Sequence, residues 1–218
     1  MQKILGSILC LVVLGCGGGQ SGPDGPTAEE RELEKIKSIP LTVDALAGQE
    51  VPVLPITLVV PDSSLSAGGL FQERDVLLRW TDSIIQYKME SRAPEVAWKF
   101  PDALRRLARR SPGIVPDPDR MGQSVMRSTS VDEVPDPFRS NLRAMVAVAG
   151  GHLAFIPAAL VFRQPEPGEV EAQLMLVMAD VRTGHVLWRS LAVGTGGSLD
   201  RALSAALDVT FPVVTFAP

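Results

Sequence analysis

Cysteine and histidine are scarce in this 218-residue chain, which has two of each. Cys10 and Cys16 both lie near the N-terminus, far from His152 and His185. A disulfide scaffold needs a set of spaced cysteines, and a structural zinc site needs Cys and His pairs at short spacing. The sequence therefore predicts no disulfide framework, no metal site and no bound cofactor.

An excess of basic residues is also lacking. The chain has 21 Lys and Arg against 25 Asp and Glu, a formal net charge of −4. This balance excludes a nucleic-acid binder that relies on bulk positive charge. Hydrophobic residues make up 45% of the chain and charged residues 21%, the proportions of a globular protein. A chain of this length can bury one full core.

A short apolar run near the N-terminus is typical of a signal peptide. Lys3 precedes apolar residues 4–14, about half of the ~20 residues that a membrane-spanning helix needs. The run ends in the string VLGC, closing at Cys16, which resembles the lipobox of bacterial lipoproteins. The resemblance implies that residues 1–15 are removed and that Cys16 carries the acyl chains that anchor the protein to a membrane. The alternative is an ordinary secreted protein cleaved near residues 15–19.

The residues after the lipobox bear on location and domain organisation. Gly17 rather than Asp follows the cysteine, and the lipoprotein resemblance then implies the outer membrane, facing the periplasm. Residues 16–48 are rich in glycine, proline and charge, so we expect a flexible charged tether. Residues 49–218 are expected to form one domain.

The pattern of that domain predicts an α/β fold. Strands are expected at 51–60, 95–100, 152–162, 171–181 and 185–193, and helices at 73–92, 101–110, 136–149 and 199–209. On the first helix, the spacing predicts an inward face of Val76, Leu77, Trp80, Ile84, Tyr87 and Met89. Residues 112–135 and 194–198 are expected to be loops. This order predicts a mixed sheet with a C-terminal antiparallel meander, flanked by about four helices.

A hairpin with the pattern D-x-x-T-G-x-V-x-W joins the last two expected strands. Its residues are Asp180, Thr183, Gly184 and Trp188. The hairpin, the following helix and the lipobox together resemble envelope lipoproteins of the CsgG, LpoB and TolB-N-terminal-domain type. That resemblance implies a non-enzymatic module that assembles with another envelope protein. The hairpin string itself is explained by its turn, because Asp can bind turn amides and Gly can adopt a positive φ.

The candidate partner-binding residues are four arginines on one side of the second expected helix: Arg105, Arg106, Arg109 and Arg110. They suggest contact with an anionic partner, although a solvated basic helix end would look the same. The sequence predicts no catalytic residue. Two alternatives stay open, a periplasm-facing hydrolase that uses carboxylates and a subunit of a homo-oligomeric envelope or secretion complex.

Overall fold

The computed structural model describes residues 38–66 and 69–212. The expected signal peptide, Cys16 and the tether as far as residue 37 lie outside the described residues. The strands are β1 (Glu50–Pro52), β2 (Val59–Pro61), β3 (Ala97–Lys99), β4 (Leu153–Arg163), β5 (Val170–Asp180) and β6 (Val186–Gly196). The α-helices are α2 (Arg74–Arg92), α3 (Pro101–Arg110), α4 (Phe138–Ala149) and α5 (Leu199–Thr210). Short 3₁₀ helices are η1 (Val43–Leu46), η2 (Gly69–Phe71), η3 (Pro118–Arg120) and η4 (Gln123–Arg127).

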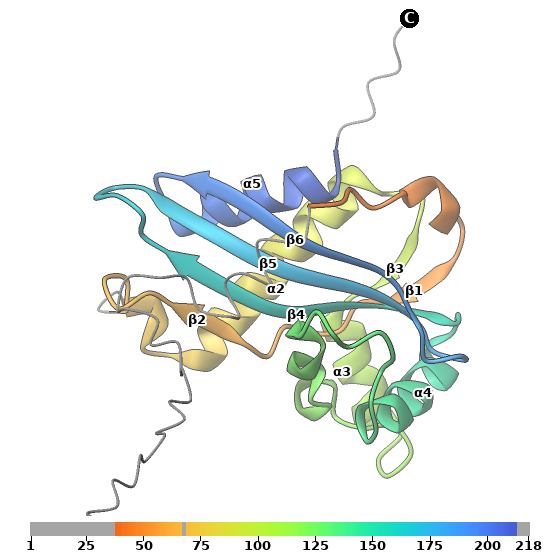
Figure 1. The fold of residues 1–218 in the computed structure, drawn as a ribbon. Helices are drawn as coiled ribbons and strands as arrows, with labels where there is room; N and C mark the ends of the chain where they lie inside the picture. Colours follow the sequence, from red (N-terminus) through yellow and green to blue (C-terminus); the bar gives the residue numbers. More distant parts are fainter. Residues whose placement is uncertain (1–37, 67–68, 213–218) are drawn as a thin grey trace, which may run out of the picture.

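The main sheet has the order β2-β4-β5-β6. The β2 strand runs parallel to β4, whereas β4, β5 and β6 form an antiparallel meander. Helices cover both faces, with α2 and α5 on one side and α3 and α4 on the other (Figure 1). The expected α/β fold with a mixed sheet, a C-terminal meander and about four helices is therefore confirmed.

The strand β5 divides the core into two halves. Its successive side chains point to opposite faces, as the pleat of a strand requires. Leu174, Leu176 and Met178 pack with α2 and α5, while Met175 and Val177 pack with α3 and α4. A strand buried on both faces has no polar alternation, which is why residues 171–181 are almost uniformly apolar.

The prediction of one continuous strand at 51–60 is wrong. The structure divides it into β1, which pairs with β3 in a separate two-stranded sheet, and β2, which lies at the edge of the main sheet. Pro52 and Pro55 explain the division, because proline has no N–H to donate to a ladder. Between them the backbone N–H of Val53 bonds to Lys99 and that of Leu54 bonds to Phe155, so the chain crosses from one sheet to the other.

The domain begins before residue 49. Leu41, Val43 and Leu46, which the sequence places in the tether, are buried in the core. The Leu41 N–H bonds to the Thr210 carbonyl and the Ile39 N–H to the Ser190 hydroxyl. The C-terminal part of the expected tether is therefore a piece of the folded domain from about residue 38.

Two further expectations are corrected by packing. On α2 the buried residues are Leu77, Thr81, Asp82, Ile85 and Met89, whereas Val76 is 48% and Tyr87 71% exposed. Trp80 and Ile84, which were expected to face inward, are partly buried against the core, so the inward face is turned away from Val76 and Tyr87 and towards Ile85. The helix expected from residue 136 begins at Phe138, with Pro137 as its N-cap.

The segment 112–135, which was expected to be a loop, contains two short helices and contributes to the core. It forms η3 and η4 and buries Met121 and Met126 in the second half of the core. Arg189 on β6 holds it in place, because its guanidinium donates to the carbonyls of Met126, Ser128 and Val131. Burial lowers the pKa of Arg189 from its ordinary value. Through these bonds the partly buried Arg189 side chain connects the segment to β6 at the edge of the sheet.

Candidate ligand-binding cleft

The four arginines of α3 have different environments. Arg106, Arg109 and Arg110 are exposed, but Arg105 turns inward and its side chain is only 18% exposed. A helix places residues four apart on nearly the same side, so position along the helix does not explain this difference. The difference comes from carboxylates on other elements.

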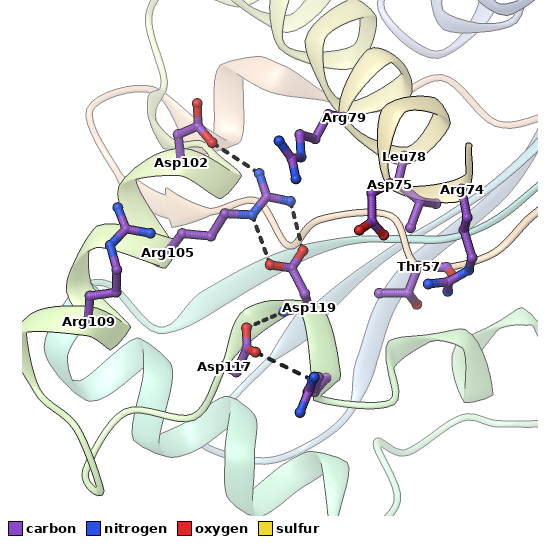
Figure 2. A pocket seen from close by; sticks show the side chains of 11 residues that line it. Thr57, Arg74, Asp75, Leu78, Arg79, Asp102, Arg105, Arg109, Asp117 and Asp119 are labelled. Carbon is purple, nitrogen blue, oxygen red and sulfur yellow. Dashed lines mark hydrogen bonds and ion pairs between the residues drawn. The ribbon is translucent and has the colours of Figure 1, made fainter. Parts of the chain in front are cut away.

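Three aspartates surround the Arg105 guanidinium. Asp119 of η3 accepts two bonds, at 2.9 Å from Nε and 2.7 Å from a terminal nitrogen. Asp82 of α2 accepts at 2.9 Å and Asp102 of α3 at 3.0 Å. Figure 2 shows the bonds to Asp119 and Asp102 as dashed lines. The pairing raises the pKa of Arg105 above its ordinary value, chiefly through the Asp119 hydrogen bonds. Arg105 therefore ties α2, α3 and η3 together as a permanent cation.

Asp82 lies beneath this network and is 8% exposed. Burial raises its pKa to about 6, although the Ile56 N–H and Arg105 both favour the carboxylate. One oxygen accepts from the Ile56 N–H at 2.9 Å and the other from Arg105. Sequence analysis missed Asp82. The sequence did contain one sign of it. A carboxylate three residues before Ile85 falls on the apolar side of an amphipathic helix, and a carboxylate buried there needs a hydrogen-bonding or cationic partner.

A cleft of about 590 Å³ opens above this network. It is lined from α2, α3, η3 and the segment before β2, and its wall carries charges of both signs (Figure 2). The lining residues with charged side chains are Arg74, Asp75, Arg79, Asp102, Arg105, Arg109, Asp117, Asp119 and Arg120. Of the four predicted arginines, Arg105 and Arg109 line the cleft, whereas Arg106 and Arg110 do not.

The carboxylates at this site bear on the hydrolase alternative. A carboxylate general acid must hold its proton near neutral pH and must reach the ligand. Asp82 has the raised pKa, but both of its oxygens are already bonded beneath the cleft floor. Asp102 and Asp119 face the cleft but accept bonds from the Arg105 cation. The arrangement suits charge recognition better than proton transfer.

The residues of the hairpin motif do not line the cleft. Asp180 accepts from the N–H groups of Arg182 and Thr183, and Gly184 has φ +86°. Burial would raise the pKa of Asp180, but these backbone hydrogen bonds outweigh it and hold the pKa below its ordinary value. The Trp188 ring stacks on Phe155, with centroids 6.3 Å apart. The motif shapes a turn and fills the core, far in sequence from the residues of the cleft.

Across 38–66 and 69–212, no cluster of three or more His, Cys, Asp or Glu side chains has a geometry that could hold a metal ion. None of the helices in the same ranges combines the length and apolarity needed to cross a bilayer.

Neither a protein-family model nor a curated protein matches the sequence. Among solved structures, the chain is similar to the LpoB C-terminal domain from Salmonella enterica, with 13% identity, a TM-score of 0.34 and coverage of 77% of this chain and 91% of that one. It is also similar to the PelC dodecamer from Paraburkholderia phytofirmans, with 12% identity, a TM-score of 0.37 and coverage of 82% and 95%. A third match is lipoprotein GNA1162 from Neisseria meningitidis, with 11% identity, a TM-score of 0.29 and coverage of 68% and 79%.

The matches include LpoB structures, and LpoB is one of the lipoprotein types that the sequence resembles. Their identities are 11–13% and their TM-scores lie below 0.5. They therefore carry no conclusion about a ligand or a partner.

Proposed function

We propose that this chain is a lipid-anchored lipoprotein of the bacterial outer membrane, and that its α/β domain is a non-catalytic binding or assembly module for another component of the cell envelope. The observation that carries the proposal is Cys16, the last residue of a VLGC string directly behind a short apolar run. The other cysteine, Cys10, lies inside that run and would leave with the signal peptide. Gly17 after the cysteine supports the outer membrane as the destination.

The length of chain between anchor and domain limits where the domain can work. Twenty-two residues, 17–38, separate Cys16 from Ile39, which among the described residues is the first whose backbone is hydrogen-bonded to the rest of the domain. A fully extended chain spans at most ~3.3–3.6 Å per residue, so the domain stays within about 80 Å of the leaflet that holds the acyl chains. Confinement of this kind raises the effective concentration of the domain at any partner on the same surface.

The charged cleft supports binding as the role of the domain. Its floor is fixed by the bonds of Arg105 to three elements, and its wall presents exposed arginines such as Arg79 and Arg109. Rigid placement of charged groups in a hollow favours recognition, because little order has to be gained when a ligand arrives. The binding role is therefore proposed for the face formed by α2, α3 and η3.

The Cys16→Ser variant tests the anchor. The natural chain is expected to sediment with membranes and to resist extraction by high salt, because each buried methylene of two or three acyl chains contributes about 0.8 kcal/mol. The Cys16→Ser variant should carry no acyl chains, and most of it should no longer sediment with membranes. The measurement is the share of protein that partitions into the detergent phase of a Triton X-114 extract.

Cys10→Ser is the matched control, because it removes a thiol of the same apolar run without touching the lipobox. It should partition as the natural chain does. Equal partitioning of the Cys10 and Cys16 variants would contradict the proposed anchor.

A further inference from the structure

The C-terminal end of α3 carries positive charge that is not matched locally. Residues 103–116 contain four arginines and no acidic residue. Arg105 turns inward to its aspartates. Arg106 and Arg110 are exposed, and among the described residues neither forms a hydrogen bond or an ion pair. They line neither the cleft nor the hollow of about 420 Å³ beside it. Residues four apart on a helix point to the same side, so these two cations lie together on the outer side of α3.

An uncharged loop with an exposed apolar side chain follows this end of α3. Ile114 is 69% exposed, and among the large apolar side chains of the described residues only Tyr87, at 71%, is more exposed. A Cβ atom at Gly113 would meet nothing within 4 Å, so this part of the loop stands clear of the domain. Figure 2 shows the loop projecting beyond the end of α3. Its base is fixed, because Val115 is buried and its N–H bonds to the Ser111 carbonyl at 3.0 Å.

The aspartates nearest in sequence are distant from this end of the helix or already paired. Asp102 lies in the first turn of α3, about 12 Å along the helix axis from Arg110. That separation exceeds the Debye length of about 8 Å at physiological salt. Asp117 and Asp119 face the cleft, and each is paired with an arginine there. The outer side of α3 near Arg110 therefore has a positive potential.

Positive charge beside an exposed apolar side chain suits an anionic membrane surface. Arginine binds lipid phosphates, while the apolar side chain enters the boundary between the headgroups and the acyl chains. We propose that Arg106, Arg110 and Ile114, which we call the α3 tip, dock the domain on the anionic phospholipids of the leaflet that holds the acyl anchor. Each arginine close to such a surface favours the docked state about fivefold. So small a surface binds weakly by itself, and it depends on the anchor to hold it near the membrane.

The inference rests on the anchor proposed above, and the length of the tether permits it. Residues 17–38 reach up to about 80 Å, whereas a domain of this size is about 40 Å across. The α3 tip can therefore reach the leaflet wherever the tether joins the domain. Docking would also set the position of the cleft. Arg109, which lies between Arg106 and Arg110 in the sequence, lines the cleft, so the cleft would open beside the membrane surface.

The position of residue 114 relative to the bilayer tests the proposal. The acylated mature chain has no free thiol, so Ile114→Cys offers one site for a fluorophore that brominated lipid quenches. The acylated protein is placed in vesicles of phosphatidylglycerol and phosphatidylcholine in equal parts, or of phosphatidylcholine alone. Tyr87→Cys is the matched control, because Tyr87 is similarly exposed but lies on α2, on the opposite side of the main sheet. Quenching is expected at position 114 on the anionic vesicles alone, and at position 87 on neither.

The arginines are tested in the protein labelled at position 114. Arg106→Gln with Arg110→Gln should lower the ratio of docked to undocked protein about 25-fold, fivefold for each arginine. Arg182→Gln with Arg201→Gln is the matched control, because both arginines are exposed but lie on the hairpin turn and α5. It should leave the quenching unchanged.

Two results would overturn the docking and leave the anchor standing. One is an equal loss of quenching in both pairs of arginine variants. The other is a label at position 114 that stays unquenched while the protein floats with the anionic vesicles, which would leave the arginines as a surface for an acidic protein. A chain that floats with neither kind of vesicle would overturn the anchor and the docking together.

Discussion

Asp82→Asn is expected to raise the free energy of unfolding by up to about 3 kcal/mol at pH 7.5. The carboxylate of Asp82 is buried, and burial raises its pKa from 3.8 to about 6, so at pH 7.5 the folded protein holds a charge in an unfavourable place. An amide is neutral and keeps an oxygen for the Ile56 N–H, but its NH2 group takes the place of the oxygen that accepts from Arg105, so the change gains less than the full cost of the buried charge. Arg105 keeps its bonds to Asp119 and Asp102. Urea unfolding followed by circular dichroism measures the change.

The sign of the pH dependence follows from the same shift. Because the pKa of Asp82 is higher in the folded state, the folded protein binds more protons than the unfolded chain between about pH 4 and pH 6. The contribution of Asp82 to stability is therefore greatest below about pH 4 and is lost as the pH rises through about 6. The advantage of Asp82→Asn should disappear at pH 4.

Asp102→Asn is the matched control, since Asp102 bonds to the same arginine but its side chain is 75% exposed. It should change the free energy of unfolding by less than about 1 kcal/mol at either pH. A loss of stability in Asp82→Asn at pH 7.5 would contradict the account. It would show that the ion pair with Arg105 outweighs the cost of burial.

Gly194→Ala is expected to destabilise the domain by about 3 kcal/mol or more. A Cβ atom at Gly194 would lie 2.1 Å from the Ala206 backbone nitrogen and 2.6 Å from the Ala202 carbonyl oxygen, both in α5. Backbone atoms of a packed helix cannot rotate away as a side chain can, so α5 as a whole would have to move off the sheet. Thermal unfolding followed by circular dichroism measures the loss.

Gly197→Ala provides the comparison from the same stretch of sequence. A Cβ atom there would have its nearest neighbour, the Gly168 carbonyl oxygen, at 4.0 Å. This variant should unfold within about 0.5 kcal/mol of the natural chain. If Gly194→Ala and Gly197→Ala unfolded at the same temperature, the close approach of α5 to β6 would be disproved.

The same glycines show where sequence analysis reaches its limit. The GTGGS run at 194–198 has the local composition of a loop, yet β6 continues through Gly196. What the sequence does not reveal is that α5 crosses so closely that positions 194 and 196 have no room for a side chain. By contrast, β5 and α5 were predictable within one or two residues, because an apolar run and a 3.6-residue period are local signals.

The candidate site was only partly predictable for the same reason. The four arginines of α3 stand out as a cluster in an acidic chain, but the sequence does not separate Arg105 from its neighbours. The partners that separate it, Asp82 and Asp119, are 23 and 14 residues away. Pairing between residues so far apart in the sequence depends on how α2, α3 and η3 pack together. A periodic pattern in the sequence cannot predict that packing.

The mature N-terminus tests the central claim most directly, because both the location and the reach of the domain depend on acylation of Cys16. The protein is purified from the envelope of a bacterial host, and the mass of its N-terminal peptide is determined by mass spectrometry. We expect a peptide that begins at Cys16 and carries the added mass of a diacylglycerol and an amide-linked acyl chain. A mature chain that begins beyond Cys16, or an unmodified Cys16, would contradict the account.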